Sequence, residues 1–157
     1  MRRVFFSFHF QRDSFLVGQV RNSWLGNAAF QGQPYLDKAQ WESIERQGDR
    51  AIQNWIDTQM NGTSVTVVLI GAETLQRRWV KYEIAETLER GAGLVGVSLT
   101  GMTNINRTVE YKSCPVAGSP FETKMFGSSY PVYNWASQNG RQNLGTWIQQ
   151  AAIRAGR

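Results

Sequence analysis

The stretch Val65-Thr66-Val67-Val68-Leu69-Ile70 decides the fold class. It is apolar apart from one threonine, rich in β-branched side chains, and lacks the alternation of a strand that faces solvent on one side. Such a run is typical of a central strand in a parallel sheet, buried on both faces. The stretch Arg77-Arg78-Trp79-Val80-Lys81-Tyr82-Glu83-Ile84 follows it, and Val80, Ile84 and Leu88 recur at helical spacing, so a helix is expected there up to Arg90-Gly91.

The rest of the chain repeats this order of strand and helix. Further strands are expected at Val4–Phe8, Leu94–Val97 and Pro131–Trp135, with a short edge strand at Tyr35-Leu36. Further helices are expected where apolar residues recur at helical spacing: after a cap at Asp13 or Ser14 (Leu16, Val20, Trp24), from Gly48-Asp49 (Ala51, Ile52, Trp55, Ile56, Met60), and near the end of the chain (Leu144, Trp147, Ile148, Ala151, Ala152). The alternation indicates an α/β fold of the flavodoxin-like type, a mostly parallel sheet with helices on both faces.

Three segments lack a clear period. Asn27 to Pro34 is loop-like, Asp37 to Glu45 is interpreted as a polar connection, and Gly101 to Ser129 is expected to be an irregular insertion rather than a linker, because foldable sequence follows it. The 157 residues suit a single domain, 1–157, with one sizeable core.

Composition narrows the classes of partner. The net charge is +5, but the arginines are scattered and no basic tract is interleaved with aromatic residues, so nucleic-acid binding is not expected. No segment approaches the roughly 18 apolar residues of a membrane span. Met1-Arg2-Arg3 leads directly into a strand rather than a signal peptide, and a lone Cys114 fits a reducing compartment, so a cytoplasmic location is expected.

Glu83 lacks the partner that a surface helix glutamate usually has. Its helical neighbours are Trp79, Val80, Glu86 and Thr87, none of them a cation. An unpaired carboxylate beside an aromatic ring and a like charge should have a raised pKa, which is a signature of functional sites. The alternative from the residues alone is an ordinary solvated glutamate.

Several familiar motifs fail on context. Gly91-Ala92-Gly93-Leu94-Val95-Gly96 matches the dinucleotide-binding pattern, but it ends a helix and enters a strand, the reverse of what a pyrophosphate site requires. A single histidine with a single cysteine argues against a protein zinc site, and no nucleophile elbow supports a hydrolase triad. Ligands of open α/β sheets bind in a crevice outside the carboxyl ends of the strands. We therefore expect one crevice to be lined by Ser7-Phe8-His9, the Asp37–Trp41 loop and the start of the Trp79–Glu83 helix.

These residues together resemble a known family. Val4–Phe10, Trp41-Glu42, Thr63–Gly71 and Arg77–Ile84 look like the TIR-like proteins of bacterial Thoeris antiphage defence, the ThsB group. The resemblance covers roughly residues 1 to 100 and weakens in the insertion. In enzymatic TIR domains a tryptophan is followed four residues later by a glutamate, and this pattern falls on Trp79 and Glu83.

The resemblance implies an NAD-consuming enzyme. It assigns to Glu83 the cleavage of the nicotinamide–ribose bond of NAD, which is the substrate, so that no separate cofactor or metal is expected. It further implies a cyclic ADP-ribose isomer as the product, a separate effector reached through this diffusible nucleotide, self-association into TIR assemblies, and a phage-derived trigger. The residues expected to bind the substrate are Phe5, Ser7, Phe8, His9, Trp41 and Trp79.

One departure from the family pattern leaves the pyrophosphate contacts open. Many TIR domains have basic residues directly after the first strand, where this chain has His9-Phe10, so Arg12, Arg77 and Arg78 are the alternatives. Other classes of function also stay open at this point: a non-catalytic interaction module of the same fold, and a flavin-binding protein.

Overall fold

A five-stranded, all-parallel sheet forms the centre of the protein. The computed structural model describes residues 2–24, 30–34, 36–123, 125 and 129–157. The strands are β1 (Arg2–Ser7), β2 (Phe30–Gly32), β3 (Val65–Ile70), β4 (Gly93–Ser98) and β5 (Val132–Asn134), in the spatial order β2-β1-β3-β4-β5. All six residues of β3 are buried, so its predicted place at the centre of a parallel sheet is confirmed.

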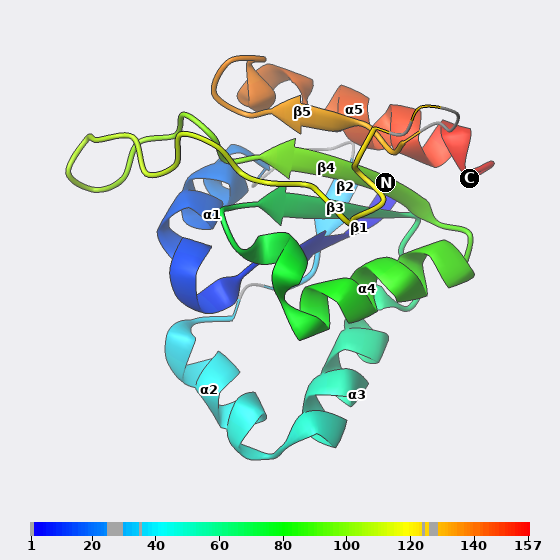
Figure 1. Ribbon diagram of the computed structural model, residues 1–157. Coiled ribbons are helices and arrows are strands. Elements are labelled where there is room, and N and C mark those ends of the chain that lie inside the picture. Colours follow the sequence, from blue (N-terminus) through cyan, green and yellow to red (C-terminus); the bar gives the residue numbers. More distant parts are fainter. Residues whose placement is uncertain (1, 25–29, 35, 124, 126–128) are drawn as a thin grey trace.

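Helices cover both faces of the sheet (Figure 1). On one face lie α1 (Phe10–Trp24) and α5 (Gly140–Arg154), which also pack against each other. On the other face lie α3 (Asp49–Met60) and α4 (Arg78–Glu89), the latter preceded by a short 3-10 helix, η1 (Thr74–Gln76). The remaining helix, α2 (Lys38–Arg46), packs beside α3. The predicted α/β class, a mostly parallel sheet with helices on both faces, is therefore confirmed.

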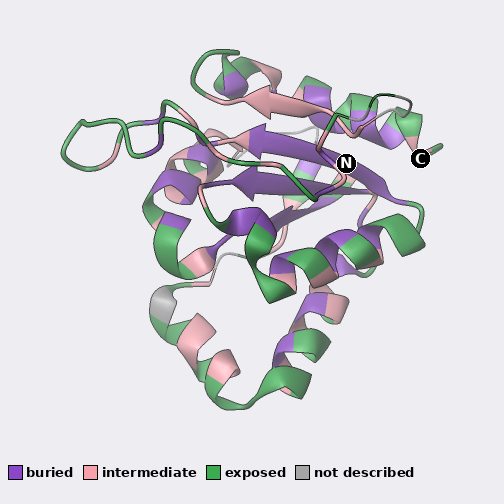
Figure 2. Ribbon diagram, viewed as in Figure 1, coloured by how far each residue is buried: buried purple, intermediate pink, exposed green. Residues whose placement is uncertain are grey.

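The alternation of side chains along β1 and β3 separates the two layers of the core. Val4 and Phe6 face α1, whereas Phe5 faces α3 and packs with Ile52, Ile56 and Met60. Figure 2 shows β3 and β4 buried along most of their length, while the described side chains of α2 are exposed or intermediate. Ser7 follows the same alternation as Phe5, which directs its side chain to the layer of α3 and α4.

Two predicted boundaries on the first crossover are wrong. Helix α1 begins at Phe10, so Asp13 lies in its first turn, donates its backbone N–H to the His9 carbonyl, and is buried instead of capping the helix. The edge strand is Phe30–Gly32, inside the segment predicted as a loop; Leu36 lies in no strand, and Tyr35 and 25–29 lie outside the described residues. Pairing with the exposed edge of β1 forms this strand, which single-sequence periodicity does not reveal.

The polar connection predicted at Asp37 to Glu45 is also wrong, because helix α2 occupies it. Asp37 is the N-cap: its side chain accepts from the Gln40 backbone N–H at 2.8 Å, and the Gln40 side chain accepts from the Asp37 N–H at 2.9 Å. This reciprocal capping box starts the helix.

The apolar face predicted for α4 is confirmed in part. Val80 and Ile84 are buried as predicted, but Leu88 is 37% exposed.

The segment from Gly101 to Ser129 contains no helix or strand among its described residues, only an isolated bridge between Thr103 and Val109. Two of its aromatic side chains, Tyr111 and Phe121, are nevertheless buried in the cores of opposite faces. The Tyr111 hydroxyl donates to the buried Asp13 carboxylate, which also accepts from Thr74 Oγ1 at 3.3 Å. The segment is therefore tied to α1 and to the loop that follows β3.

No helix of the described ranges is long and apolar enough to cross a membrane.

Gly71, directly after β3, should tolerate no side chain. A Cβ at this position would overlap the Asp13 carboxylate and break its hydrogen bonds to Tyr111 and Thr74. We expect Gly71→Ala to lower the free energy of unfolding by about 1–3 kcal/mol, measured by urea denaturation. Gly18→Ala is the matched control: Gly18 lies within α1 with open space around it, so the same change should stabilise by about 0.5–1 kcal/mol. Equal effects of the two changes would contradict this account.

Candidate active site

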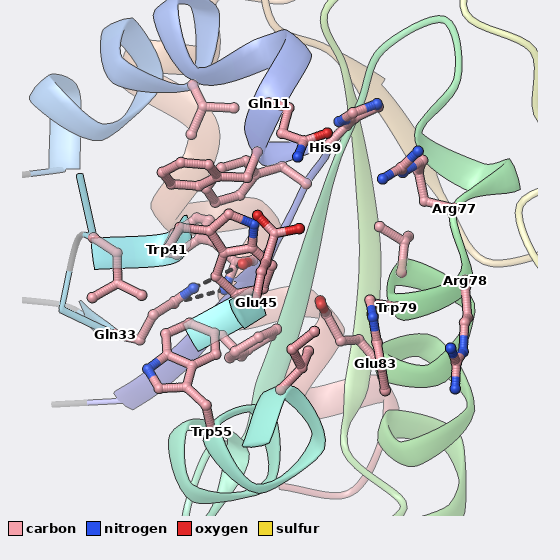
Figure 3. A pocket seen from close by; sticks show the side chains of 18 of the residues that line it. His9, Gln11, Gln33, Trp41, Glu45, Trp55, Arg77, Arg78, Trp79 and Glu83 are labelled. Atoms are coloured by element: carbon pink, nitrogen blue, oxygen red, sulfur yellow. Dashed lines mark hydrogen bonds between the residues drawn. The ribbon is translucent and has the colours of Figure 1, made fainter. Parts of the chain in front are cut away.

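A cavity of about 470 Å³ lies at the carboxyl end of β1, within the size range of small-molecule sites. Side chains from β1, α1, α2, α3 and α4 line it, together with the segment that follows β2. Figure 3 shows the Glu83 carboxylate pointing into this space, opposite Trp41, Glu45 and Trp55. The mouth is bordered by His9 and Arg77, at the edge where α/β sheets bind their ligands.

The carboxyl group of Glu83 is the most perturbed acid of this cavity. Its residue is 7% exposed, and burial raises the pKa of the carboxyl group from the ordinary 4.5 to about 8. The Ser7 hydroxyl is near enough to lower that pKa by a smaller amount. Among the described residues, however, neither Ser7 Oγ nor Glu83 Oε2 has a hydrogen-bond partner of normal geometry. The predicted direction of the shift is therefore confirmed, but its cause is burial, and the charge of Glu86 is not among its causes.

Contacts to α3 fix the orientation of α4. The Tyr82 hydroxyl donates to Asp57 Oδ1 at 2.6 Å, and Arg78 forms an ion pair with Asp49 at 2.7 Å. The Arg78 guanidinium lies over the Trp79 ring, 4.6 Å from its centroid, and the Tyr82 ring meets Trp79 edge-on at 5.6 Å. With the outer face of α4 held in this way, Glu83 stays directed toward the cavity.

An aromatic wall, formed by Phe8, Phe10, Trp41 and Trp55, faces Glu83. Successive ring centroids lie 5.8, 5.7 and 5.7 Å apart, from the end of β1 across α1 and α2 to α3. These spacings are typical of packed aromatic pairs. The wall therefore offers flat apolar surface on which a heteroaromatic ring can stack, across the cavity from a carboxylate.

Gln33 keeps the edge of β1 open to the cavity. Strand β2 ends at Gly32, and the Gln33 side chain then takes the place of a neighbouring strand: its Nε2 donates to the Phe6 carbonyl at 2.8 Å, and its Oε1 accepts from the Phe6 N–H at 2.9 Å. These bonds satisfy the β1 backbone without a further strand. The space beside β1 therefore stays open, and it is lined by Phe5 and by the aromatic wall.

His9 lies buried at the mouth, 7% exposed. Burial lowers its pKa most, the positive charge of Arg77 lowers it further, and Asp13 and Glu73 act in the opposite direction. Its Nε2 lies 3.9 Å from Glu73 Oε2. At neutral pH the imidazole is therefore neutral, able to donate one hydrogen bond and accept another.

Comparison with known proteins identifies the family to which this fold and cavity belong. A sequence profile of the family described as "Thoeris protein ThsB, TIR-like domain" matches residues 5–104. The chain is also 33% identical over 147 residues to the "Putative cyclic ADP-D-ribose synthase ThsB1" of Bacillus cereus (strain MSX-D12), an alignment that covers 93% of this chain and 71% of the relative. The chain belongs to the ThsB TIR-like family of Thoeris defence. The resemblance drawn from the sequence is thereby confirmed.

In this ThsB-family domain, most residues expected at the site do lie together. Phe5, Phe8, His9, Trp41, Trp79 and Glu83 all line the cavity. Ser7 does not line it but is buried beside it, close enough to affect the pKa of Glu83. Their roles in substrate binding and catalysis stay predictions.

Other side chains of the ThsB-family cavity were assigned to the core or missed. Trp24 and Trp55 were expected in the core by helical spacing. Both pack against core clusters, but each is only half-buried and also lines the cavity. Gln33 and Glu45 were not predicted as site residues at all. The available signal for Glu45 was the Asp37–Gln40 capping box, which starts a helix and places Trp41 and Glu45, four residues apart, on one face.

The apparent dinucleotide-binding pattern does not begin a helix in this ThsB-family domain. Gly91 follows the last turn of α4 with φ of 67°, so the first glycine of the apparent dinucleotide-binding pattern ends a helix, as expected. The described residues contain no group of three or more histidine, cysteine, aspartate or glutamate side chains placed to hold a metal ion.

Proposed function

We propose that this ThsB-family protein is an enzyme that cleaves the nicotinamide–ribose bond of NAD and converts the remainder to a cyclic ADP-ribose isomer. The observation that carries the proposal is the Glu83 carboxyl group, buried without a counter-charge from any described residue, in an aromatic cavity of small-molecule size. The name of the relative as a cyclic ADP-D-ribose synthase supports the same class of reaction.

The chemistry requires a group that stabilises positive charge on a sugar. When the bond between C1 of the ribose and the ring nitrogen of nicotinamide breaks, the electron pair leaves with nicotinamide, which becomes neutral. The ribose then carries the positive charge as an oxocarbenium-like centre, as in glycoside hydrolysis. An ionised Glu83 in a cavity that excludes water would stabilise this charge and orient the ribose hydroxyls. The aromatic wall, with Trp79, offers stacking surfaces for the nicotinamide and adenine rings.

The fate of the ribose carbon decides the product. Attack by water forms a C–O bond, releases a proton and gives ADP-ribose. Attack by the adenine or by another nucleophile of the same molecule closes a ring, and the product then contains one water less. The second outcome needs a folded substrate and few water molecules, conditions that the aromatic wall and the buried position of Glu83 favour.

The proposal includes the cellular context that the family implies: NAD as substrate, self-association into an active TIR assembly, a phage-derived trigger, and a separate effector that binds the diffusible product.

Nicotinamide release from NAD is the direct test. We expect the protein to release nicotinamide and to form a product one water lighter than ADP-ribose, identified by mass spectrometry. Protein concentration should be varied to promote assembly, and extract from infected cells should be added to supply a trigger. Formation of ADP-ribose alone would support cleavage of the nicotinamide–ribose bond but contradict the formation of a cyclic product. Absence of nicotinamide release under all these conditions would contradict the proposal and favour a non-catalytic interaction module.

A further inference from the structure

The arginines around the cavity differ in whether their charges are already paired. Arg78 is bound to Asp49 at 2.7 Å and lies over the Trp79 ring. Arg12 forms an ion pair with Glu73 at 2.9 Å and donates through Nε to the Tyr111 hydroxyl at 2.9 Å. Both guanidinium groups therefore have partners that a ligand would have to displace.

Arg77 is different. It lines the cavity, yet its guanidinium forms no hydrogen bond or ion pair with any residue in the described part of the chain. Its charge nevertheless reaches the site, since Arg77 is the second-largest cause of the lowered pKa of His9. Figure 3 shows the Arg77 side chain directed toward His9 and the mouth, whereas Arg78 extends along the outside of α4. Among the described residues that line the cavity, Arg77 is thus a cation that is free to bind an anion.

The backbone around Arg77 favours an anion at the same place. Arg77 is the N-cap residue of α4, and no side chain caps this helix end. The unpaired N–H groups of a first helical turn and the helix dipole both attract negative charge. Arg77, Arg78, Trp79 and Val80 all border the cavity, so this turn faces it. The free guanidinium and the uncapped turn together form a site suited to phosphate oxygens.

We propose that Arg77 binds the pyrophosphate of the dinucleotide substrate and thereby sets the distance between that group and the reacting ribose. This inference rests on the proposed function and adds a specificity residue to it. Arg77 and Glu83 are six positions apart, about 9 Å along a helix axis, which leaves room for a ribose and its phosphate between the two side chains. Arg77 therefore distinguishes a dinucleotide from a nucleoside that lacks phosphate.

The test measures binding without turnover. In a Glu83→Gln background, isothermal titration calorimetry should give dissociation constants for NAD and for nicotinamide riboside, which has the same nicotinamide and ribose but no phosphate. We expect Arg77→Gln to weaken NAD binding by about tenfold or more, the effect of losing a charge-assisted hydrogen bond, and to leave riboside binding unchanged. Arg77→Lys, which keeps the charge but loses the planar fork, should lie between the two.

A matched variant controls for charge. Arg141→Gln removes an exposed cation from α5, on the other face of the sheet. It should weaken NAD binding much less than Arg77→Gln. Unchanged NAD affinity in Arg77→Gln, or an equal loss of NAD and riboside, would overturn the role of Arg77 while the proposed function stands. If the parent Glu83→Gln protein binds no NAD in any assembly state and the wild type releases no nicotinamide, the proposed function fails, and this inference fails with it.

Discussion

Glu83→Gln is expected to lower the rate of nicotinamide release from NAD by at least about a hundredfold while leaving the fold intact. Glutamine has nearly the same volume and fits the buried position. It cannot, however, carry the negative charge that would stabilise the positive charge developing on the ribose. The matched control is Glu89→Gln, the same change at an exposed position of the same helix, which should leave the rate unchanged. Both rates should be measured with the assembled protein, with circular dichroism as the check of folding.

The pH dependence of the rate offers a readout that a structural role would not affect. With a pKa of about 8 in the free protein, Glu83 is mostly protonated at pH 6 and ionised at pH 9. If its ionised form is required, kcat/KM for NAD should rise nearly tenfold per pH unit below 8 and level off above it. Equal nicotinamide release by wild type and Glu83→Gln, or a profile that is flat between pH 6 and 8, would remove Glu83 from the mechanism.

The framework of the fold was predictable because its elements carry local signals. β3 is buried on both faces and reads as a continuous apolar run, and α5 buries Leu144, Trp147 and Ile148 on one face. The two elements that were missed differ in cause. β2 depends on a partner distant in the sequence, because it forms by pairing with the edge of β1. α2 carries local signals, the Asp37–Gln40 capping box and the half-buried Trp41 and Ile44, but none of its described side chains is fully buried.

The site likewise has features that local sequence signals predict and features that depend on packing between distant segments. Glu83 was recognisable because its helical neighbours include no cation, and Trp79 because it precedes Glu83 by one turn. The degree of burial of Glu83, which raises its pKa, depends on β1, α3 and the aromatic wall packing around it. Gln33 could not be predicted, because it acquires its place only when the edge of β1 is assembled. Glu45 was missed although the capping box that starts α2 was a local signal for it.

The buried Glu83 should also make the stability of the protein depend on pH. The pKa of its carboxyl group is about 8 in the folded protein and about 4.5 when exposed in the unfolded chain. Between these values the unfolded chain releases the proton and the folded chain keeps it. The folded state therefore binds more protons, and its stability falls as pH rises, by about 1.4 kcal/mol per pH unit from this group. The contribution is fully present below pH 4.5 and lost by pH 8.

Comparison with Glu83→Gln isolates this contribution from those of other groups. Asp13, whose pKa is also raised by burial, acts in the same direction, whereas His9, whose pKa is lowered, makes stability rise with pH below its ordinary pKa. Both are present in wild type and variant, so they cancel in the difference. From pH 5 to pH 7 the stability of Glu83→Gln relative to wild type should increase by about 2–3 kcal/mol, measured by urea denaturation at constant ionic strength.

The size of this difference would measure the free energy with which the fold opposes a negative charge at position 83. A cationic nicotinamide ring near Glu83 would offset part of it, because an opposite charge lowers the pKa of a carboxyl group. NAD would then promote the ionised form that its own cleavage requires, and bound NAD should reduce the pH dependence of stability. Parallel stability curves for wild type and Glu83→Gln between pH 5 and 8 would show that Glu83 is already ionised in the resting protein. In that case Glu83 would be poised for cleavage before any substrate binds.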